Sequence, residues 1–288
     1  MRFHNAMFAA AALSALVAAT VSTPALAHRQ WLLPSTTTLA GTSEYVTVDA
    51  AVSNDLFYAD HVAMSPDQVK VWAPDGSEAK LENAATGRYR STFDVKIDKP
   101  GTWVIGTERS GVNGTFKVDG ETWRVGGRGR PGMAGPGGAP ARVVANVDQI
   151  PANATEVKLT ETAAKNLIFV TADAPTTDAF KPTGKGLEFQ PITHPNALVS
   201  DEEAQFRFLV DGKPAAGLTV SVVPGGKKYR ESEEAQELTT GPDGVVRVQW
   251  PIAGWYWLNA SYSDDKASHP KAGERRLGFT TTLEVVAP

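Results

Sequence analysis

From residue 28 onward, apolar and polar residues alternate with a period of two in short segments that turn-forming residues separate. Successive side chains of an extended chain point to opposite faces, so this period predicts β-strands with one buried face. Sequences such as Pro74-Asp75-Gly76 and Asp119-Gly120 lie between the segments and are typical of hairpin turns. In the first half of the chain the predicted strands are 45–52, 68–73, 90–97, 102–107, 115–118 and 121–125.

The second half repeats this organisation and carries a weak internal similarity to the first. The predicted strand 93–97 runs through Gly101 into an aromatic strand, and the predicted strand 245–250 runs through Gly254 into another. Two sheet domains built on similar plans would produce this repeat. We therefore predict an all-β protein with two tandem β-sandwich domains. The further strands predicted in this half are 187–189, 206–210, 218–223 and 255–261.

Two segments interrupt the strand pattern. Residues 154–171 have extended ends, but 160–165 could form a short helical turn, and the sequence leaves this choice open. Residues 126–140 hold seven glycines among fifteen residues, which cannot form a packed element and predict a mobile surface insertion. The insertion lacks the lysine and hydroxyl placement of a phosphate-binding loop, which disfavours that alternative.

The N-terminal 27 residues have the layout of a secretory signal peptide. Arg2 precedes an apolar run at 8–20, and a small-x-small triplet follows at 25–27. The run of about 13 residues is shorter than the roughly 20 that a membrane span needs, so we expect a periplasmic protein without membrane insertion. The predicted organisation is a leader at 1–27, an N-terminal sandwich at 28–175, a linker at 176–186 and a C-terminal sandwich at 187–288.

Composition argues against several classes of function. The absence of cysteine excludes disulfides, thiolate metal sites and a cysteine nucleophile. A formal net charge of −4 argues against nucleic acid as a partner, because phosphate binding needs a basic surface. Neither G-x-S-x-G nor H-E-x-x-H occurs, and we predict that the protein is not an enzyme. Strand aromatics such as Trp103, Trp250 and Tyr256 are expected to fill the cores.

Histidine is the residue type that points to specific chemistry. After removal of the leader His28 becomes the first residue, and its α-amine and imidazole can close a chelate ring on one metal ion. The amine has an ordinary pKa of about 8, low enough for a divalent cation to displace its proton. One more imidazole completes a nitrogen-rich set suited to Cu(II), Ni(II) or Zn(II). His61, which follows Asp60, is the first candidate for this donor, and His194 is the second.

The residues after His28 indicate that the mature terminus is held in place. Trp31 and Leu33 face one way in a short strand that Pro34 ends, and their burial would fix His28 close to the sheet. Met64 adds only a weak thioether donor, which argues against a store of Cu(I).

Three stretches of the sequence resemble bacterial periplasmic proteins of the nickel and cobalt uptake class, described as NikM-like or NikK-like. These stretches are AHRQWLLPS from residue 27, VSNDLFYADHVAM from residue 52 and GLEFQPITHPNALVSDEEAQFRFLVDGKPAAGLTV from residue 186. The resemblance implies an immunoglobulin-like metal-binding part followed by a prealbumin-like or carboxypeptidase-regulatory sandwich. It also implies that an exposed N-terminal histidine, here His28, contributes to a metal site with His61 as partner. The family commonly has an acid where His194 stands, and the glycine-rich tract departs from the family.

These observations predict a periplasmic protein that binds nickel, cobalt or copper through His28, His61 and His194. It would assist metal uptake by passing the ion to an importer or an outer-membrane receptor. Two alternatives stay open. The chain could be a structural or interaction protein of the cell envelope without a metal, since sandwiches serve many functions. The same chelate could instead hold copper as in lytic polysaccharide monooxygenases, although no polysaccharide-binding face is recognisable in the sequence.

Overall fold

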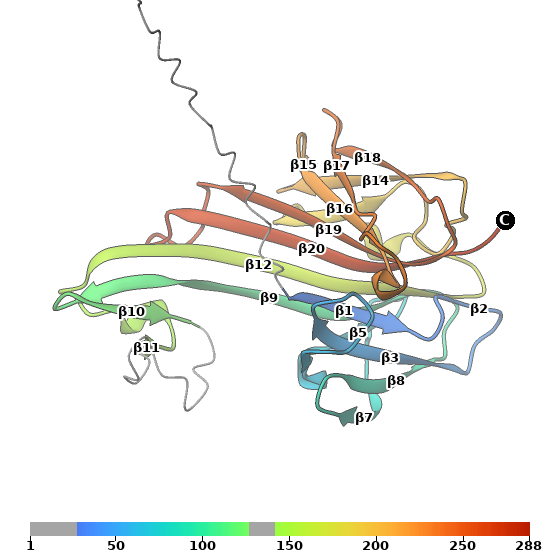
Figure 1. The fold of residues 1–288 in the computed structure, drawn as a ribbon, viewed down its shortest axis with the longest axis horizontal. Coiled ribbons are helices and arrows are strands. Elements are labelled where there is room, and N and C mark those ends of the chain that lie inside the picture. Colours follow the sequence, from blue (N-terminus) through green and yellow to red (C-terminus); the bar gives the residue numbers. More distant parts are fainter. Residues whose placement is uncertain (1–27, 127–141) are drawn as a thin grey trace, which may run out of the picture.

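The computed structural model describes residues 28–126 and 142–288, and in them the chain is all β (Figure 1). The predicted fold class is therefore confirmed. The predicted leader at 1–27 lies outside the described residues, as does the glycine-rich insertion 126–140 apart from Gly126. No helix in the described part of the chain is long and apolar enough to span a membrane.

Within residues 28–126 and 142–288, twenty strands form three sheets. Sheet A contains β1 (Arg29–Pro34), β3 (Glu44–Ser53), β4 (Val62–Ala63), β7 (Glu82–Thr86) and β8 (Ser91–Ile97). Sheet B contains β2 (Thr38–Leu39), β5 (Lys70–Trp72), β6 (Glu78–Ala79), β9 (Gly101–Val118), β10 (Glu121–Val125), β11 (Val143–Val144), β12 (Thr155–Ala172), β16 (Thr219–Pro224), β17 (Gln236–Thr239), β19 (Gly254–Asp264) and β20 (Glu274–Val285). Sheet C contains β13 (Leu187–Pro191), β14 (Glu203–Val210), β15 (Lys213–Pro214) and β18 (Val245–Gln249). The 3-10 helices are η1 (Pro66–Gln68), η2 (Val147–Gln149), η3 (Asp178–Phe180) and η4 (Lys227–Tyr229).

Sheet B separates two hydrophobic cores, because sheet A packs on one of its faces and sheet C on the other (Figure 1). Strand β12 takes part in both cores. Its residues Ile168 and Val170 join the core with sheet A, whereas Leu167 and Phe169 join the core with sheet C. Successive side chains of a strand point to opposite faces, so the two sandwiches share this sheet.

Burial on both faces explains why the second part of the segment 155–171 shows no clear period in the sequence. The structure makes them part of β12, without a helical turn at 160–165. The seven consecutive residues from Asn166 to Ala172 are all buried. A strand covered on both faces is a nearly continuous buried run, not an alternating one, so it gives no period-two signal.

The shared sheet also contains strands from both sides of the predicted linker at 176–186. Strand β12 pairs in parallel with β20, with Thr160 opposite Glu274 at one end of the pairing. The sequence analysis did not foresee this pairing. The division into domains at 28–175 and 187–288 stays a prediction.

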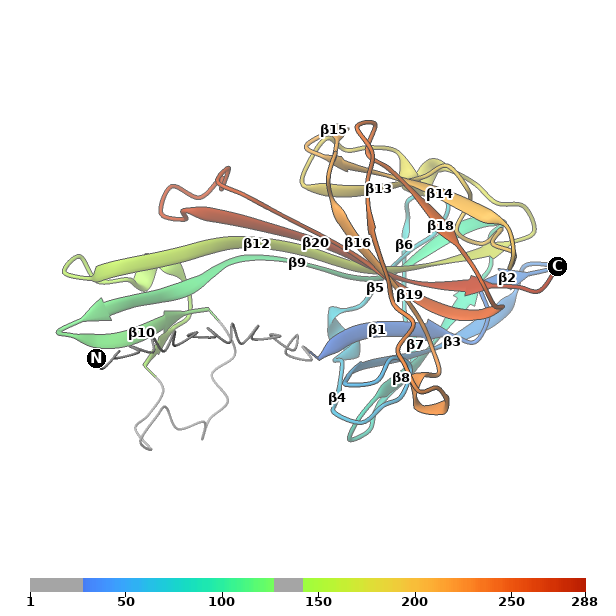
Figure 2. The ribbon, with the colours of Figure 1, turned by 45° about the horizontal axis from the view of Figure 1, so that its top comes forward.

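Strand β9 is longer than expected and extends with β12 away from both cores (Figure 2). The predicted strands 102–107 and 115–118 form one strand, although its residues 108–111 are exposed. A small hydrophobic cluster lies at the far end of this extension, where β10 folds back on β9. Its buried members are Phe116, Val125, Val147 and Leu159. Hydrogen bonding to β12 keeps the exposed middle of β9 extended where the sequence carries no burial pattern.

The repeat predicted around Gly101 and Gly254 is present. The two glycines have φ angles of +116° and +145° and begin β9 and β19, two long strands of sheet B. The strands before them, β8 and β18, belong to sheets A and C. A side chain would be strained at these φ values, so glycine allows the chain to pass between layers. Trp103 and Tyr256, two positions after the glycines, are buried as expected, and so is Trp250.

Candidate functional site

The starts of β1 and β4 lie at the same end of β3. Strand β1 pairs with one edge of β3, where Arg29 lies opposite Ser53, and β4 pairs with the other edge, beginning at Val62. His28 comes directly before β1, and His61 comes directly before β4. Pairing on both edges of one strand therefore brings these two histidines to one place.

The side chains of His28 and His61 stack face to face. Their ring centroids are 3.7 Å apart, and the ring planes differ by 3°. Both residues are exposed to solvent, so each ring has room to turn about its side-chain bonds. The structure thus brings together the two histidines that the sequence analysis placed first, whereas metal binding itself stays a prediction.

Trp31 anchors the strand that carries His28. Its side chain is 1% exposed, and its indole Nε1 donates a 2.6 Å hydrogen bond to the Ser53 hydroxyl. Leu33 packs against the same hydrophobic cluster, so these two residues hold β1 as expected, whereas cleavage before His28 stays a prediction. The buried members of this cluster, called the Trp31 cluster below, are Trp31, Ala51, Leu56, Val223 and Trp257. They join β1 and β3 to β16 and β19, and so tie His28 to sheet B.

The loop before His61 is closed by its own hydrogen bonds. The Asp60 carboxylate accepts bonds from the Asn54 backbone N–H (2.9 Å) and side-chain amide (3.3 Å). Phe57 packs edge-on against Trp31, with ring centroids 5.8 Å apart. The hydrogen bonds to Asp60 and the contact between Phe57 and Trp31 together fix the position of His61 at the end of the loop.

Other side chains near the pair are engaged elsewhere. Asp60 is used by the loop, and Met64 is buried in the core with sheet A. Across residues 28–126 and 142–288, no group of three or more His, Asp or Glu side chains is placed to hold a metal ion. Any metal site at His28 and His61 therefore needs a donor from outside these side chains.

His194, in the loop after β13, does not join the pair, because both of its ring nitrogens already have hydrogen-bond partners elsewhere. Its Nδ1 accepts a hydrogen bond from the Asn196 backbone N–H (3.2 Å). The Nε2 atom then carries the ring proton of the neutral form and donates to the Thr102 hydroxyl at 3.1 Å, with the Thr176 carbonyl at 3.4 Å. His194 also packs edge-on against Phe180. This arrangement pins the loop to sheet B and leaves no ring nitrogen for a metal.

Burial lowers the pKa of His194. A depressed histidine pKa means that the unfolded chain binds the proton more readily than the folded one, so stability is lost as pH falls from about 6.5 through the folded pKa. We expect the urea midpoint of the protein to decrease as the pH is lowered from 7.5 to 5. The His194→Gln variant should lose part of this slope, and an unchanged slope in the variant would contradict a buried neutral imidazole.

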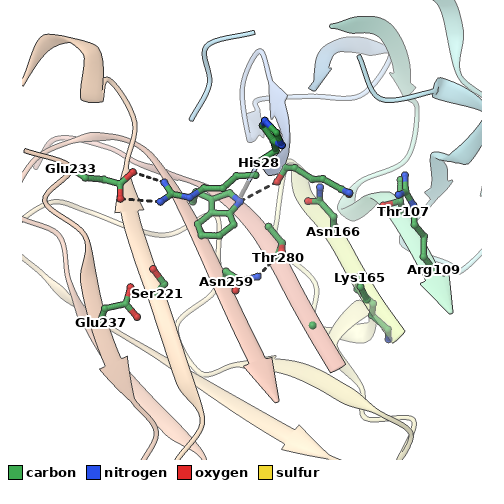
Figure 3. Close-up of a pocket in the computed structure, with 15 residues that line it drawn as sticks. His28, Thr107, Arg109, Lys165, Asn166, Ser221, Glu233, Glu237, Asn259 and Thr280 are labelled. Atoms are coloured by element: carbon green, nitrogen blue, oxygen red, sulfur yellow. Dashed lines mark hydrogen bonds and ion pairs between the residues drawn. The ribbon is translucent and has the colours of Figure 1, made fainter. Parts of the chain in front are cut away.

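A pocket of about 670 Å³ opens beside His28 on the part of sheet B that sheet A leaves uncovered (Figure 3). This volume lies in the usual range of small-molecule sites. The first residues of the described chain, His28, Arg29 and Gln30, line one side. The floor comes from β9, β12, β20, β19, β16 and β17. The pocket and the histidine pair therefore adjoin.

Six polar side chains form a continuous row across this floor. Each lies directly opposite the next in the register of sheet B, from β9 to β17. The members of this polar row are Thr107, Asn166, Thr280, Asn259, Ser221 and Glu237. Neighbouring strands are about 4.8 Å apart, so hydrogen-bonding groups continue over about 24 Å. A face of this composition suits a polar ligand.

Asn166 is a buried member of the polar row whose amide has unused hydrogen-bonding groups. It is 5% exposed, and neither its Nδ2 nor its Oδ1 has a partner among the described residues. Leaving a buried polar group unpaired costs about 1–3 kcal/mol. Asn259, by contrast, donates from Nδ2 to the Thr280 hydroxyl at 3.0 Å. The pocket is therefore lined by a residue whose buried amide is unpaired among the described residues.

Two arginines reach the pocket with different partners. Arg29 forms a bidentate ion pair with Glu233, with one bond of 2.9 Å, and lies over the Trp257 ring. The hydrogen bonds from Arg29 hold the pKa of Glu233 below its usual range. Arg109 donates to the neutral amide of Gln68 and forms no ion pair within the described residues. Its positive charge is therefore available to an anion.

The sequence analysis missed the pocket. The available signal for the pocket in the sequence was the presence of the polar residues Asn166 and Asn259 inside long strands. Their alignment depends on the register of six strands, which the pattern of a single chain does not reveal.

A family model described as "Domain of unknown function (DUF4198)" matches residues 25–264 of the chain. No curated protein matches the sequence. Similar solved structures include the D0-D1 domain of Intimin, at 11% identity over 88% of this chain and 97% of that one, with a TM-score of 0.20. A DUF4785 family protein from Legionella pneumophila is 8% identical over 80% of this chain and 50% of that one, with a TM-score of 0.22. Such low values support no argument about the site.

Proposed function

The chain belongs to the DUF4198 family, a domain of unknown function, and we propose that it is an exported protein that binds a transition metal through His28 and His61. The observation that carries this proposal is the contact between the two imidazole rings, 3.7 Å apart at the end of β3. Two histidines distant in sequence are held together here by strand pairing and by the Trp31 cluster.

The missing third donor would come from cleavage after Ala27. This cut frees the α-amine of His28, which closes a chelate ring with the imidazole of the same residue. His61 supplies the second imidazole when the exposed rings turn to direct one nitrogen each at the ion.

A set of three nitrogen donors selects the class of metal. Such sites favour Cu(II) over Ni(II) and Co(II), whereas Mg²⁺ and Ca²⁺ prefer oxygen ligands. The resemblance to nickel and cobalt uptake proteins makes these two ions the other candidates. Three protein donors leave coordination positions open, so an acceptor can take the ion by ligand exchange. We therefore propose a periplasmic carrier without enzymatic activity that delivers metal to an importer or an outer-membrane receptor.

Isothermal titration of Ni(II) and Cu(II) into protein that begins at His28 tests this function. One alanine added before His28 displaces the amine, and His61→Gln removes the second imidazole. We expect each change to weaken binding at least tenfold, which corresponds to about 1.4 kcal/mol. At a metal concentration of 100 times Kd, the unmodified protein should gain about 2.7 kcal/mol of stability.

The matched control is His269→Gln, because His269 lies in the turn before β20, where its ring accepts a hydrogen bond from the Lys271 backbone N–H. This variant should bind metal as the unmodified protein does. Equal affinity in all four proteins would contradict the proposed chelate. An unchanged melting temperature with every metal would instead favour a structural protein of the cell envelope.

A further inference from the structure

The floor of the pocket is hollowed next to Arg109. Ala164 on β12 lies opposite Arg109 on β9 and opposite Gly278 on β20. The three residues line the pocket, and two of them have little or no side chain. Room is therefore left over Ala164 and Gly278 at the level of the sheet surface, next to the strand position of Arg109.

Arg109 and Asn166 face this hollow from neighbouring strands. Asn166 is two residues from Ala164 on the same face of β12, which makes it a diagonal neighbour of Arg109, with about 7–8 Å between Cα atoms. A carboxylate can accept hydrogen bonds from the guanidinium. The Asn166 amide both donates and accepts, so it can bond a hydroxyl or a second carboxylate.

The pocket offers little to an apolar or a stacking ligand. An apolar molecule would leave the buried Asn166 amide unpaired. The Trp257 ring carries Arg29 above it, and its Nε1 already donates to the Gln30 carbonyl at 3.1 Å. A sugar ring therefore finds no open aromatic face there.

We propose that this pocket binds a small organic carboxylate that carries hydroxyl groups. Arg109 pairs with a carboxylate, Asn166 bonds a hydroxyl or carboxylate oxygen, and the Thr280 hydroxyl adds a neighbouring polar contact. Compounds of this class chelate transition metals, and His28 lies on the rim. The metal then reaches His28 and His61 as an organic complex, a step that rests on the function proposed above.

Citrate, with and without equimolar Ni(II), is the probe for protein that begins at His28. Titration should show citrate binding in both cases and tighter binding of the nickel complex. Arg109→Gln should weaken both about 10-fold to 100-fold, because hydrogen bonds to charged groups are lost. Asn166→Ala should weaken both about tenfold. It should not lower the urea midpoint in the way that loss of a hydrogen bond within the protein does, since the Asn166 amide has no partner among the described residues.

Arg247→Gln is the matched control, because it removes the same charge from the exposed face of β18, where Arg247 pairs with Glu203. It should bind citrate as the unmodified protein does. Absence of citrate binding in both forms, or equal affinity in the Arg109 and control variants, overturns the proposal. If citrate binds and nickel adds nothing, the carboxylate site stands and delivery of the metal as an organic complex fails, whereas failure of the metal function itself is shown by the titration of Ni(II) and Cu(II) without citrate.

Discussion

Replacement of Arg275 by methionine is expected to destabilise the protein by about 3–5 kcal/mol. Arg275, on β20, is 9% exposed and bonds two carboxylates at once. Its Nε and Nη2 donate to Asp264 at 2.9 and 2.7 Å, and Nη2 and Nη1 donate to Asp211 at 2.9 and 3.2 Å. The substitution leaves the Asp264 carboxylate, whose side chain is 10% exposed, without its cation. Urea unfolding at pH 7 measures the loss.

Arg276→Met is the matched control for this prediction. The neighbouring arginine has an exposed side chain and pairs with Glu274, at 2.8 Å. Exposed ion pairs contribute about 0–1 kcal/mol, so this variant should stay within that range. If the two substitutions lower the free energy of unfolding equally, the ion pairs of Arg275 contribute no more to stability than an exposed ion pair, which would contradict the prediction.

The same network predicts a pH dependence. Hydrogen bonds from Arg275 lower the pKa of both Asp211 and Asp264. Carboxyl groups with depressed folded pKa values contribute stability above their unfolded pKa of about 3.9, and this contribution is lost as pH falls through the folded values. Arg275→Met should therefore flatten the acid side of the stability curve, and a curve parallel to that of the unmodified protein would contradict the account.

Replacement of Trp31 by alanine is expected to cost about 3–5 kcal/mol, the usual range for a buried aromatic residue. The indole packs with Val223 and Trp257 across the contact between sheets A and B, and its N–H bonds Ser53. Alanine would leave a cavity at the point where β1 is held. The measurement is again the free energy of unfolding in urea.

Loss of Trp31 should also weaken metal binding, because a smaller fraction of molecules keeps His28 beside His61. Trp123→Ala is the control, since Trp123 stacks on Phe116 in the cluster at the far end of β9. It should lower stability without changing metal affinity. If neither variant changes the metal affinity, the Trp31 cluster does not position the histidine pair, and this prediction is wrong.

Strands with one buried face were predictable from the sequence, and others were not. The alternating segments 45–52 and 121–125 correspond closely to β3 and β10, because burial follows every second residue there. Residues 166–172 are buried on both faces and 108–111 are exposed on both, so neither stretch shows a period of two. Their extended form is imposed by neighbouring strands.

The candidate site was predictable to the extent that it depends on scarce residue types. With no cysteine and few histidines in the chain, His28 and His61 stood out, and the structure places their rings in contact. His194 was the second candidate for the further imidazole, because a histidine before proline in a loop gives no sign of whether its nitrogens are used. Predicting the pocket around Asn166 would have required knowledge of the register of sheet B.

Electron paramagnetic resonance of the Cu(II)-loaded protein tests the central claim most directly. For protein that begins at His28, we expect hyperfine coupling to three nitrogen donors, from the His28 amine, the His28 ring and the His61 ring. An added alanine before His28 should remove the amine signal, and His61→Gln should remove one imidazole. A spectrum that is identical in all three proteins would show that copper binds elsewhere and would contradict the account.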